Sequence, residues 1–366
     1  LRVGQQQMIE IARNLLIPNL KILIMDEPTS SLSEQEVDVL FNIMRELTAT
    51  GISIVYISHR LEELMRIGDF VTIFRDGKLV ADAAVKEIDV PWIVKQMVGE
   101  GKSYPKRDVA VDWDKQENVL EVKNLSLPKN GGGYLLNNVS FNLKKGEILG
   151  IYGLLGAGRT EIFECIMGMR PNHTGDIILN GKKIEIQSVA DQIDKGFAWL
   201  PEDRQREGLV QTMSIAKNIA LSNIGKYTNP LGLIDKNKED AAEAEMIKDV
   251  HIKVADKDLP ILSLSGGNQQ KVVFAKGALT NPQIMLLDEP SRGIDIGAKT
   301  EIFHLIYQYA KRGVSLLVIS SELEEIIAIA DRILVLSNGI KTAELTGDDI
   351  TQDNLVKASY MGHKAN

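Results

Sequence analysis

Residues 153–160 form the segment of this sequence that is best suited to chemistry. They fit the phosphate-binding pattern GxxxxGK[ST], except that arginine replaces the lysine. Glycine permits positive φ angles, so backbone N–H groups can close around a phosphate, and a following helix N-terminus adds a favourable dipole. The segment predicts a polyphosphate-binding loop made of Gly153, Leu154, Leu155, Gly156, Ala157, Gly158, Arg159 and Thr160.

In such a loop the Thr160 hydroxyl would bind Mg²⁺, and the Arg159 cation would neutralise the terminal phosphates. Arginine is bulkier than lysine and its guanidinium is a planar fork, so we expect altered nucleotide affinity or turnover. A glycine-rich turn can also be purely structural, and this loop alone leaves that alternative open.

Two adjacent acids, Asp288 and Glu289, follow the continuous apolar run of residues 284–287. Such a run is typical of a strand in a parallel sheet that is covered on both faces. In phosphoryl transfer the first acid can hold the Mg²⁺ shell and the second can polarise the attacking water. Acids at a strand end are commonly solvated turn residues, but this pair recurs as Asp26 and Glu27, each time before proline. The recurrence favours Asp288 as a metal ligand and Glu289 as a catalytic residue.

The elements that position these residues belong to an internal repeat. Three blocks recur in one order: residues 1–7 as 264–270, residues 24–28 as 286–290, and residues 57–63 as 319–325. From Asp26 onward a constant spacing carries Asp26 onto Asp288 and Gly77 onto Gly339. The chain therefore holds two homologous domains.

We expect an α/β fold with a first domain at residues 1–98, a polar linker at 99–117 and a second, complete domain at 118–366. No residues precede the first repeated block, so the first domain is expected to be the C-terminal half of such a domain, without a phosphate loop. Its strands, predicted near residues 21–25 and 52–57, would have an open inner sheet edge that invites aggregation.

Within the second domain, alternating apolar and polar residues at 119–127 and 139–143 predict a small antiparallel β layer. Residues 147–152 are typical of a buried strand leading into the glycine-rich loop, and a helix is expected from Thr160. A helical subdomain is expected at about residues 190–259.

Composition places the chain among ordinary globular proteins and argues against other classes. Hydrophobic residues make up 44% of the 366 positions and charged residues 25%, which allows two domains with a real core. The single Cys165 excludes an intramolecular disulfide framework and a cysteine-based zinc cluster, which fits a cytosolic setting. The apolar runs have strand length, far below the roughly 20 residues that span a bilayer, and no secretory signal is evident. The net charge of −8 argues against wrapping of nucleic acid.

Residues 264–270, Leu-Ser-Gly-Gly-Asn-Gln-Gln, resemble the LSGGQ signature of the ATP-binding-cassette (ABC) family of P-loop NTPases. In that family two cassettes meet head to tail, and each ATP lies between the phosphate loop of one and the signature of the other. A small hydroxyl and bare backbone at a helix start can approach an anion closely. The resemblance implies nucleotide contacts from Ser265, Gly266, Gly267, Asn268 and Gln269, and from Gly4 and Gln5 in the first copy.

The resemblance covers nearly the whole chain and is closest to the tandem-cassette ATPases of monosaccharide importers of the ribose, galactose, xylose and arabinose type. Arg159, the Pro-Glu-Asp-Arg segment 201–204, Asn268 and the Ser-Ser-Glu segment 320–322 are like the second cassette of that group. The resemblance implies ATP and Mg²⁺ as cofactors, and membrane-spanning permease subunits as partners. It also implies an indirect partnership with a periplasmic or extracellular sugar-binding protein, and a peripheral place on the cytoplasmic face of the plasma membrane. It allows a second cassette chain as a partner and implies no nucleic acid.

Some positions depart from the general cassette pattern. His59 stands where the family has its switch histidine and is, with Glu27, the catalytic candidate of the first copy, but the second copy has Ser321 there. Serine cannot replace a titratable imidazole. Glu202 takes the glutamine-loop position, and Asp295 fits the interface aspartate.

Ser33 occupies the place that matches Asp295 in the first copy, so the two copies are asymmetric. The sequence therefore predicts an ATPase subunit that energises import of a simple sugar, with weak Mg²⁺·ATP binding and slow turnover or none in this chain. Two alternatives stay open. One is a non-hydrolysing remnant or regulatory interaction protein. The other is a soluble tandem cassette acting on ribosomes or DNA, which would need a long basic helical linker in place of residues 99–117.

Overall fold

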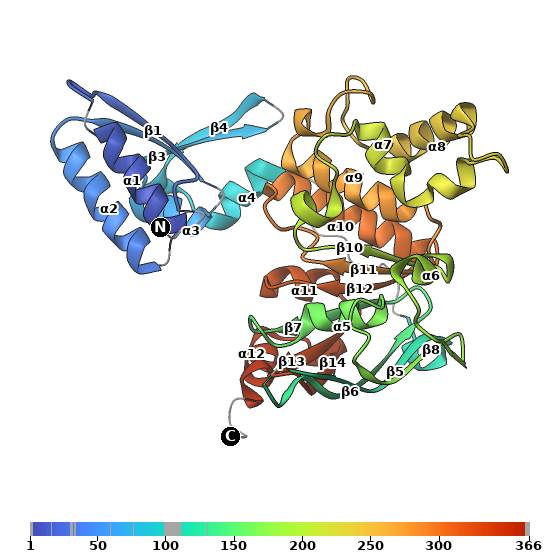
Figure 1. Cartoon of the computed structure of the whole chain (residues 1–366). Coiled ribbons are helices and arrows are strands. Elements are labelled where there is room, and N and C mark those ends of the chain that lie inside the picture. The colour runs from blue at the N-terminus through green and yellow to red at the C-terminus, as the bar shows by residue number, and fades with distance from the viewer. Residues whose placement is uncertain are drawn as a thin grey trace. The chain divides into compact units, whose positions relative to one another are not determined.

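The computed structural model describes residues 3–15, 17–29, 32, 34–58, 60–75, 77–98, 111–129 and 131–362. The chain forms two compact units, Leu1–Lys102 (unit 1) and Ser103–Asn366 (unit 2) (Figure 1). Most of the predicted linker lies outside the described residues, and the part inside them contains the short 3-10 turn Trp113–Lys115. In the described part of the chain no helix is both long and apolar enough to cross a bilayer.

Unit 2 is built on a six-stranded mixed sheet in the order β10-β11-β12-β7-β13-β14. All neighbours are parallel except the antiparallel pair β13–β14. The strands are β7 (Ile148–Gly153), β10 (Phe197–Leu200), β11 (Ile284–Asp288), β12 (Ser315–Ile319), β13 (Arg332–Ser337) and β14 (Ile340–Thr346). The buried strand predicted ahead of the glycine-rich loop is confirmed as β7, which lies near the middle of this sheet.

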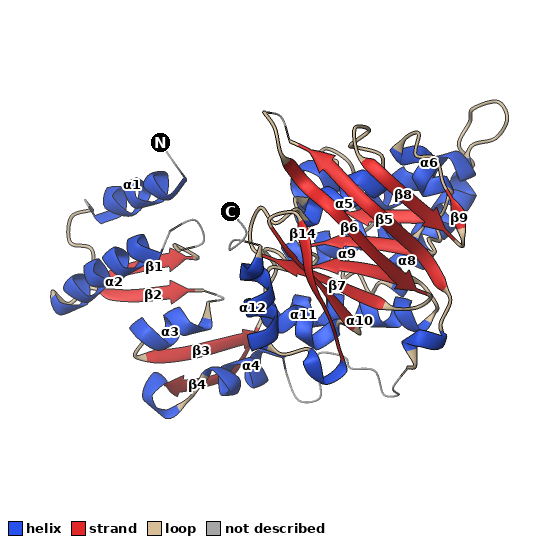
Figure 2. Ribbon diagram, turned by 90° about the horizontal axis from the view of Figure 1, so that it is seen from below, coloured by secondary structure: helices blue, strands red, loops and turns tan. Residues whose placement is uncertain are grey.

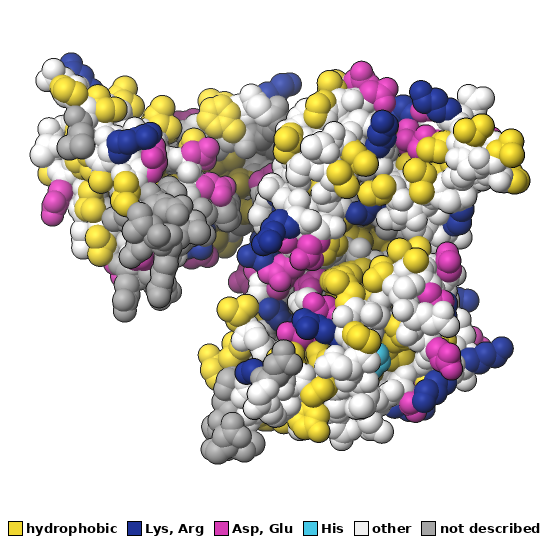
Figure 3. Space-filling view, in the orientation of Figure 1, with side chains coloured by type: hydrophobic (Ala, Val, Ile, Leu, Met, Phe, Trp, Pro, Cys, Tyr) yellow, Lys and Arg dark blue, Asp and Glu magenta, His cyan; other side chains and the backbone are white. Residues whose placement is uncertain are grey.

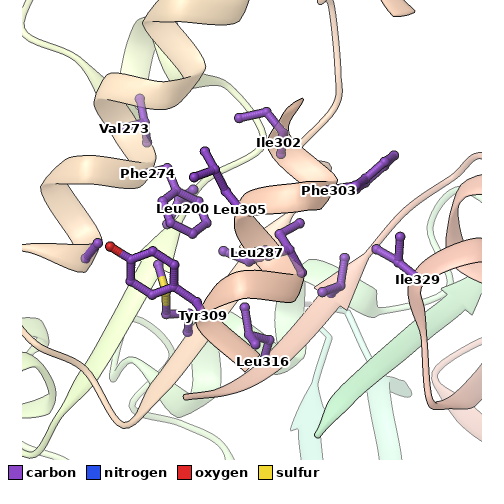
Figure 4. Close-up of a cluster of buried hydrophobic side chains, with 14 of the residues drawn as sticks. Leu200, Val273, Phe274, Leu287, Ile302, Phe303, Leu305, Tyr309, Leu316 and Ile329 are labelled. Carbon is purple, nitrogen blue, oxygen red and sulfur yellow. The ribbon is translucent and has the colours of Figure 1, made fainter. Parts of the chain in front are cut away.

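Both faces of the sheet are covered, because successive residues of a strand point to opposite sides. Met285 and Leu287 of β11 lie in one core cluster, whereas Ile284 and Leu286 lie in another. Figure 4 shows the first cluster, where side chains of α9 and α10 such as Phe274 lie over β11 and β12. All five residues of β11 are buried, as expected for a parallel strand covered on both faces.

The helices of unit 2 are α5 (Arg159–Ile166), α6 (Val189–Asp194), α7 (Ile215–Ala220), α8 (Lys236–Asp249), α9 (Gly266–Ala278), α10 (Ile296–Lys311), α11 (Leu323–Ile329) and α12 (Gln352–Met361). Most of them contact this sheet, whereas α7 and α8 contact α9. Short turns at Leu221–Tyr227, Ile261–Ser263 and Gly347–Asp349, and a π-helical segment at Arg204–Gly208, connect the helices.

A second sheet, visible in Figure 2 as broad strands, is antiparallel and has the order β6-β5-β8-β9. Its strands are β5 (Asn118–Pro128), β6 (Tyr134–Lys144), β8 (Thr174–Leu179) and β9 (Lys182–Lys183). The predicted small antiparallel layer is therefore confirmed, and the structure adds β8 and β9 to it. Its apolar face packs with Phe163 and Ile166 of α5 in the second core cluster.

The span 190–259 is not helical throughout, because it contains β10, which pairs with β11 at the edge of the main sheet. Four apolar-rich residues are too short a run to separate a strand from a helix by periodicity. The helical part of this span begins after β10 and consists mainly of α7 and α8, which contact α9.

Unit 1 contains α1 (Val3–Leu15), β1 (Ile22–Asp26), α2 (Glu34–Ala49), β2 (Ser53–Ile57), α3 (Leu61–Ile67), β3 (Phe70–Arg75), β4 (Lys78–Ala84), the turn Val85–Glu87 and α4 (Val90–Val98). Its described strands form two separate pairs, β1–β2 parallel and β3–β4 antiparallel. Leu40 and Phe41 of α2 and Met25 of β1 are buried in its core. Apolar residues on the other side of β1, such as Ile24, are exposed.

Leu286 and Ile24 occupy matching positions of the repeat but differ in burial, at 0% and 67% exposed. We expect Leu286→Ala to lower the free energy of unfolding of unit 2 by about 3 kcal/mol, because it removes buried methyl groups and leaves a cavity. Ile24→Ala should change that of unit 1 by less than about 0.5 kcal/mol. Urea titration followed by hydrogen exchange of peptides from β11 and β1 measures the two units separately. Equal losses in both variants would contradict the burial described here.

Candidate functional site

The glycine-rich loop lies between β7 and α5, the strand–loop–helix arrangement that a phosphate-binding loop requires (Figure 1). Gly156 and Gly158 have φ angles of 78° and 97°, which side-chain-bearing residues rarely adopt. A Cβ at Gly153 would lie 2.5 Å from the Leu336 carbonyl oxygen, so this glycine allows close packing on β13. The Ala157 N–H donates to the Leu154 carbonyl at 3.0 Å and closes the bend. The Leu155 side chain points to solvent and is 97% exposed.

The acid pair lies at the end of β11. Glu289 has a φ of 47°, and its N–H donates to the Ile319 carbonyl at 3.0 Å. Glu27 in unit 1 repeats both features, with a φ of 45° and a 2.8 Å bond to the Ile57 carbonyl. A left-handed glutamate is uncommon, and such strained residues are concentrated at functional sites. The strain is thus a property of the motif in both units.

The structure brings the glycine-rich loop and the acid pair of unit 2 together. Arg159 Nη1 lies 3.3 Å from Glu289 Oε1, and both side chains are about nine-tenths buried at 11% and 8% exposure. Thr160 follows Arg159 and lies close to Asp288. Burial raises the pKa of the Asp288 carboxyl, and the nearby Thr160 side chain partly offsets this rise. Four predicted site residues from two distant segments therefore share one site.

Ser321 completes this site in a way that its sequence position alone did not show. Its backbone N–H and its hydroxyl both donate to Glu289 Oε2, at 3.0 and 3.1 Å. Glu289 Oε2 therefore accepts two hydrogen bonds from Ser321, whereas Oε1 faces Arg159 only as an ion pair, since Arg159 Nη1 makes no hydrogen bond within the described residues. Sequence reasoning treated Ser321 as a departure from the histidine of the first copy. Its register after β12, which runs beside β11, was the available signal.

Asp288 has the properties of a cation ligand. It is 1% exposed, and among the described residues neither of its carboxylate oxygens accepts a hydrogen bond. Burial raises the pKa of the Asp288 carboxyl to about 7, and the Glu289 charge adds to this, whereas Thr160 and Arg159 oppose it. An unpaired buried carboxylate is costly, and a divalent cation relieves that cost. The site thus fits Mg²⁺ held by Asp288 and the Thr160 hydroxyl together with nucleotide phosphates.

The signature residues lie at the start of α9. Ser265 is the N-cap residue and accepts a 3.2 Å hydrogen bond from the Asn268 amide, whose oxygen in turn accepts from the Lys253 N–H at 3.0 Å. Gln269 donates to the Leu264 carbonyl.

Two glycines allow close packing around the start of α9. A Cβ at Gly266 would lie 2.9 Å from a nitrogen of the Arg204 guanidinium, and one at Gly267 would lie 2.4 Å from the Ala298 Cβ. The signature segment is thus held by neighbours outside the glycine-rich loop.

Arg204 is a residue that sequence reasoning missed as part of the site. Its guanidinium donates to the carbonyls of Arg292 and Gly293, at 2.7 and 3.0 Å, and so holds the segment that follows the acid pair. Glu202 pairs with the Arg292 side chain. Asp295 caps α10 by accepting from the Ala298 N–H at 2.9 Å. The clue to Arg204 was its place two residues after Glu202.

The remaining predicted site residues belong to unit 1. Gly4 and Gln5 lie in α1, where the structure describes the backbone but not these side chains. His59 and Ser33 lie outside the described residues. The roles assigned to these four residues stay predictions.

Comparison with known proteins supplies the family. The ABC transporter family model matches residues 136–292. The ribose import ATP-binding protein RbsA of Oceanobacillus iheyensis is 44% identical over 99% of this chain and 71% of its own length. The xylose import ATP-binding protein XylG of Photobacterium profundum is 42% identical over 97% of this chain and 70% of its length. The chain belongs to the ABC import ATP-binding proteins.

A third relative extends the range of sugars in this family: the galactose/methyl galactoside import ATP-binding protein MglA of Clostridium perfringens is 43% identical over 98% of this chain and 68% of its length. Solved ABC cassettes share the fold at low identity. One in its ADP conformation superposes with a TM-score of 0.57 at 21% identity, covering 67% of this chain and 99% of that one. A second, bound to ADP and Pi, gives 0.55 at 22% identity over 62% of this chain and 98% of that one. The predicted P-loop NTPase cassette fold is confirmed.

The Asp288→Asn variant tests the electrostatics of this ABC site without Mg²⁺ or nucleotide. The carboxyl ionises near 3.8 in the unfolded chain but only near 7 in the fold, so its ionisation lowers stability as the pH rises through this window. We expect Asp288→Asn to be more stable than the wild type at about pH 8 by about 4 kcal/mol, and to lose most of this advantage near pH 4. Thermal denaturation in EDTA at several pH values measures this. A pH-independent difference would contradict the assignment.

Proposed function

We propose that this chain is the ATP-binding subunit that energises import of a simple sugar by an ABC transporter. Support comes from relatives whose names specify import of ribose, xylose and galactose. The proposal includes Mg²⁺·ATP as the energy source and membrane-spanning permease subunits as partners. It also includes a peripheral position at the cytoplasmic face of the membrane and an indirect link to a sugar-binding protein.

The observation that carries the ATP-binding part is the convergence of the glycine-rich loop with the acid pair. Arg159 and Thr160 begin α5 and lie beside Asp288 and Glu289 at the end of β11. Backbone N–H groups and one cation on one side, and a metal-binding carboxylate on the other, are the groups that a Mg²⁺·polyphosphate needs. A purely structural turn would not need a buried, unpartnered Asp288 beside it.

We further propose that this site binds Mg²⁺·ATP weakly and hydrolyses it slowly. A glutamate that polarises the attacking water needs an oxygen free to accept from that water. Here Ser321 donates twice to Oε2 of Glu289, and the Arg159 guanidinium lies 3.3 Å from Oε1 as an ion pair without hydrogen-bond geometry, so a buried cation crowds the oxygen that water would need. Both side chains are about nine-tenths buried, so solvent ions screen this ion pair less than a surface pair. A nucleotide must compete with Glu289 for the Arg159 cation, which reduces the gain from phosphate binding.

The helical part of unit 2 offers a face for the permease. Hydrophobic side chains gather beside α8 in Figure 3, and the connection ahead of α8 is held as a tight turn by the bridge between Thr228 and Ile234. Leu231 and Leu233 in this turn are 84% and 63% exposed. Exposed apolar residues that lie close together are typical of protein-docking surfaces. We propose that a cytoplasmic segment of the permease covers this turn.

The slow-hydrolysis proposal is tested with the double variant Arg159→Lys Ser321→His, which has the residue types of the general cassette pattern at both positions. Because Glu289 is then no longer held by a guanidinium and a serine, we expect phosphate release at least about tenfold faster than in the wild type, within the range of general-base effects. Adding Glu289→Gln should return the rate to background. Fast turnover by the wild type that Glu289→Gln abolishes would refute slow hydrolysis, while leaving ATP binding intact.

The transport role is tested in the organism that carries the gene. Loss of the gene should lower uptake of one labelled monosaccharide, with ribose, xylose and galactose as the first to assay. Leu231→Asp Leu233→Asp should weaken copurification with the permease more than about tenfold, because a charged residue replaces each apolar contact. The same variant should leave ATP affinity unchanged. Val356→Asp, at an exposed position of α12, is the matched control. Normal uptake of every sugar after gene loss would overturn the import proposal.

A further inference from the structure

Each unit has a buried carboxylate near the start of one helix, which is α11 after β12 in unit 2 and α3 after β2 in unit 1. In unit 2, Glu325 of α11 is 1% exposed, and its Oε2 accepts from the Ser291 hydroxyl at 2.5 Å and from the Ser320 hydroxyl at 2.9 Å. The two serines belong to different loops, one after β11 and the other after β12. One carboxylate oxygen therefore ties two loops together.

Unit 1 repeats the bond to the first loop at the matching position, but its second hydroxyl comes from Tyr56 of β2, which matches Val318 and not Ser320. Glu63 of α3 is 7% exposed, and its Oε2 accepts from the Thr29 hydroxyl and from the Tyr56 hydroxyl, both at 2.6 Å. Thr29 matches Ser291, and Glu63 matches Glu325, in the register of the repeat. The hydroxyl at the first loop is thus present in both units as either serine or threonine.

The cation that balances the carboxylate is not the same in the two units. Lys299 of α10 donates to Glu325 Oε1 at 2.9 Å, whereas Arg60, just ahead of α3, donates to Glu63 Oε1 at 3.0 Å. Burying a charge is costly, and replacing such a group by an apolar residue is often neutral or stabilising. The cation differs between the two units, but the hydroxyl bond from the first loop to the carboxylate is present in both. This indicates that the carboxylate is kept for its bond to the loop and not for its ion pair.

In unit 2 the tied loops carry the residues that surround Glu289. Ser291 follows Glu289 by two positions. Ser320 directly precedes Ser321, which donates twice to Glu289. A closed set of contacts therefore runs from Glu289 through Ser321 and Ser320 to Glu325, and back through Ser291. Because Glu289 has a strained left-handed backbone, its side chain keeps one position only if its surroundings fix it.

We propose that Glu325 is a positioning residue of the nucleotide site, which fixes Ser321 where its donors meet the terminal phosphate of ATP and keeps Glu289 in place beside it. Glu325 acts through Ser291 and Ser320 and does not itself touch the nucleotide. Glu63 has the same task for Glu27 in unit 1. This inference rests on the proposed ATP-binding function. It goes beyond that function because it gives the terminal phosphate of ATP its own recognition residues, separate from the glycine-rich loop that binds the other two phosphates.

The test uses the full chain with fluorescent N-methylanthraniloyl-ATP and the matching ADP, both with Mg²⁺. Ser291→Ala removes one hydroxyl of the link, and Ser291→Thr keeps it, as at Thr29. We expect Ser291→Ala to weaken ATP binding about fivefold and to leave ADP binding within about twofold, since only ATP has the phosphate that the Ser321 donors meet. Ser291→Thr should behave as the wild type. Glu325→Gln should show the same split more strongly, if it folds by circular dichroism.

The results of this test distinguish failure of the positioning role of Glu325 from failure of the proposed ATP-binding function. Equal loss of ATP and ADP affinity in Ser291→Ala, or no loss of either, overturns the positioning role, because a merely structural link would affect both nucleotides alike or neither. Failure of Ser291→Thr to restore ATP binding overturns it as well. Failure of the wild type to bind either nucleotide instead contradicts the proposed ATP-binding function, and the inference with it.

Discussion

Asp288 and Glu289 place negative charge at the end of a strand that is buried on both faces, and this placement constrains the whole site. The sheet supplies the low-dielectric surroundings, because β11 lies between β10 and β12 and is covered by helices on one side and by α5 with the antiparallel layer on the other. In such surroundings each carboxylate needs a partner or a proton. Glu289 is paired, and Asp288 is left for a cation.

The replacement of lysine by arginine changes how this constraint is met. A lysine ammonium is a compact charge on a flexible stem, whereas the Arg159 guanidinium is a planar fork with donors in a fixed geometry. With the Arg159 side chain nine-tenths buried, its pairing with Glu289 is shielded from solvent, so it is screened much less than a surface pair. In the proposed function, the cation that would attract phosphate is therefore also the ion-pair partner of the proposed catalytic residue, Glu289.

Sequence reasoning predicted the parts of the site that local patterns determine. The glycine spacing at residues 153–160 and the apolar run before Asp288 gave β7, α5, β11 and the acid pair, because strand–loop–helix context depends on neighbouring residues. The contacts of Ser321 and Arg204 depend on which strands lie side by side, and a hydrogen bond to a backbone carbonyl has no sequence pattern. β10 was missed for a related reason, since it takes its strand conformation from pairing with β11 and its four residues show no periodicity. The roles of Glu27 and His59 stay predictions.

The repeat separates what a short segment specifies from what its surroundings supply. Glu27 and Glu289 share the left-handed backbone and the bond to the next strand, and Glu63 and Glu325 share the hydroxyl link, although the cations beside them differ. The burial of the strand differs between the two units, because Ile24 of β1 is exposed whereas Leu286, at the matching position of β11, is fully buried. The geometry of the acidic strand end is therefore encoded within the strand, its loop and the following helix. The low-dielectric surroundings, which raise the pKa of Asp288 and suit it to a divalent cation, come from β7, α5 and the antiparallel layer. The backbone shape of the acidic strand end can thus be local, but the burial that shifts the pKa of Asp288 requires the surrounding sheet, helix and antiparallel layer of unit 2.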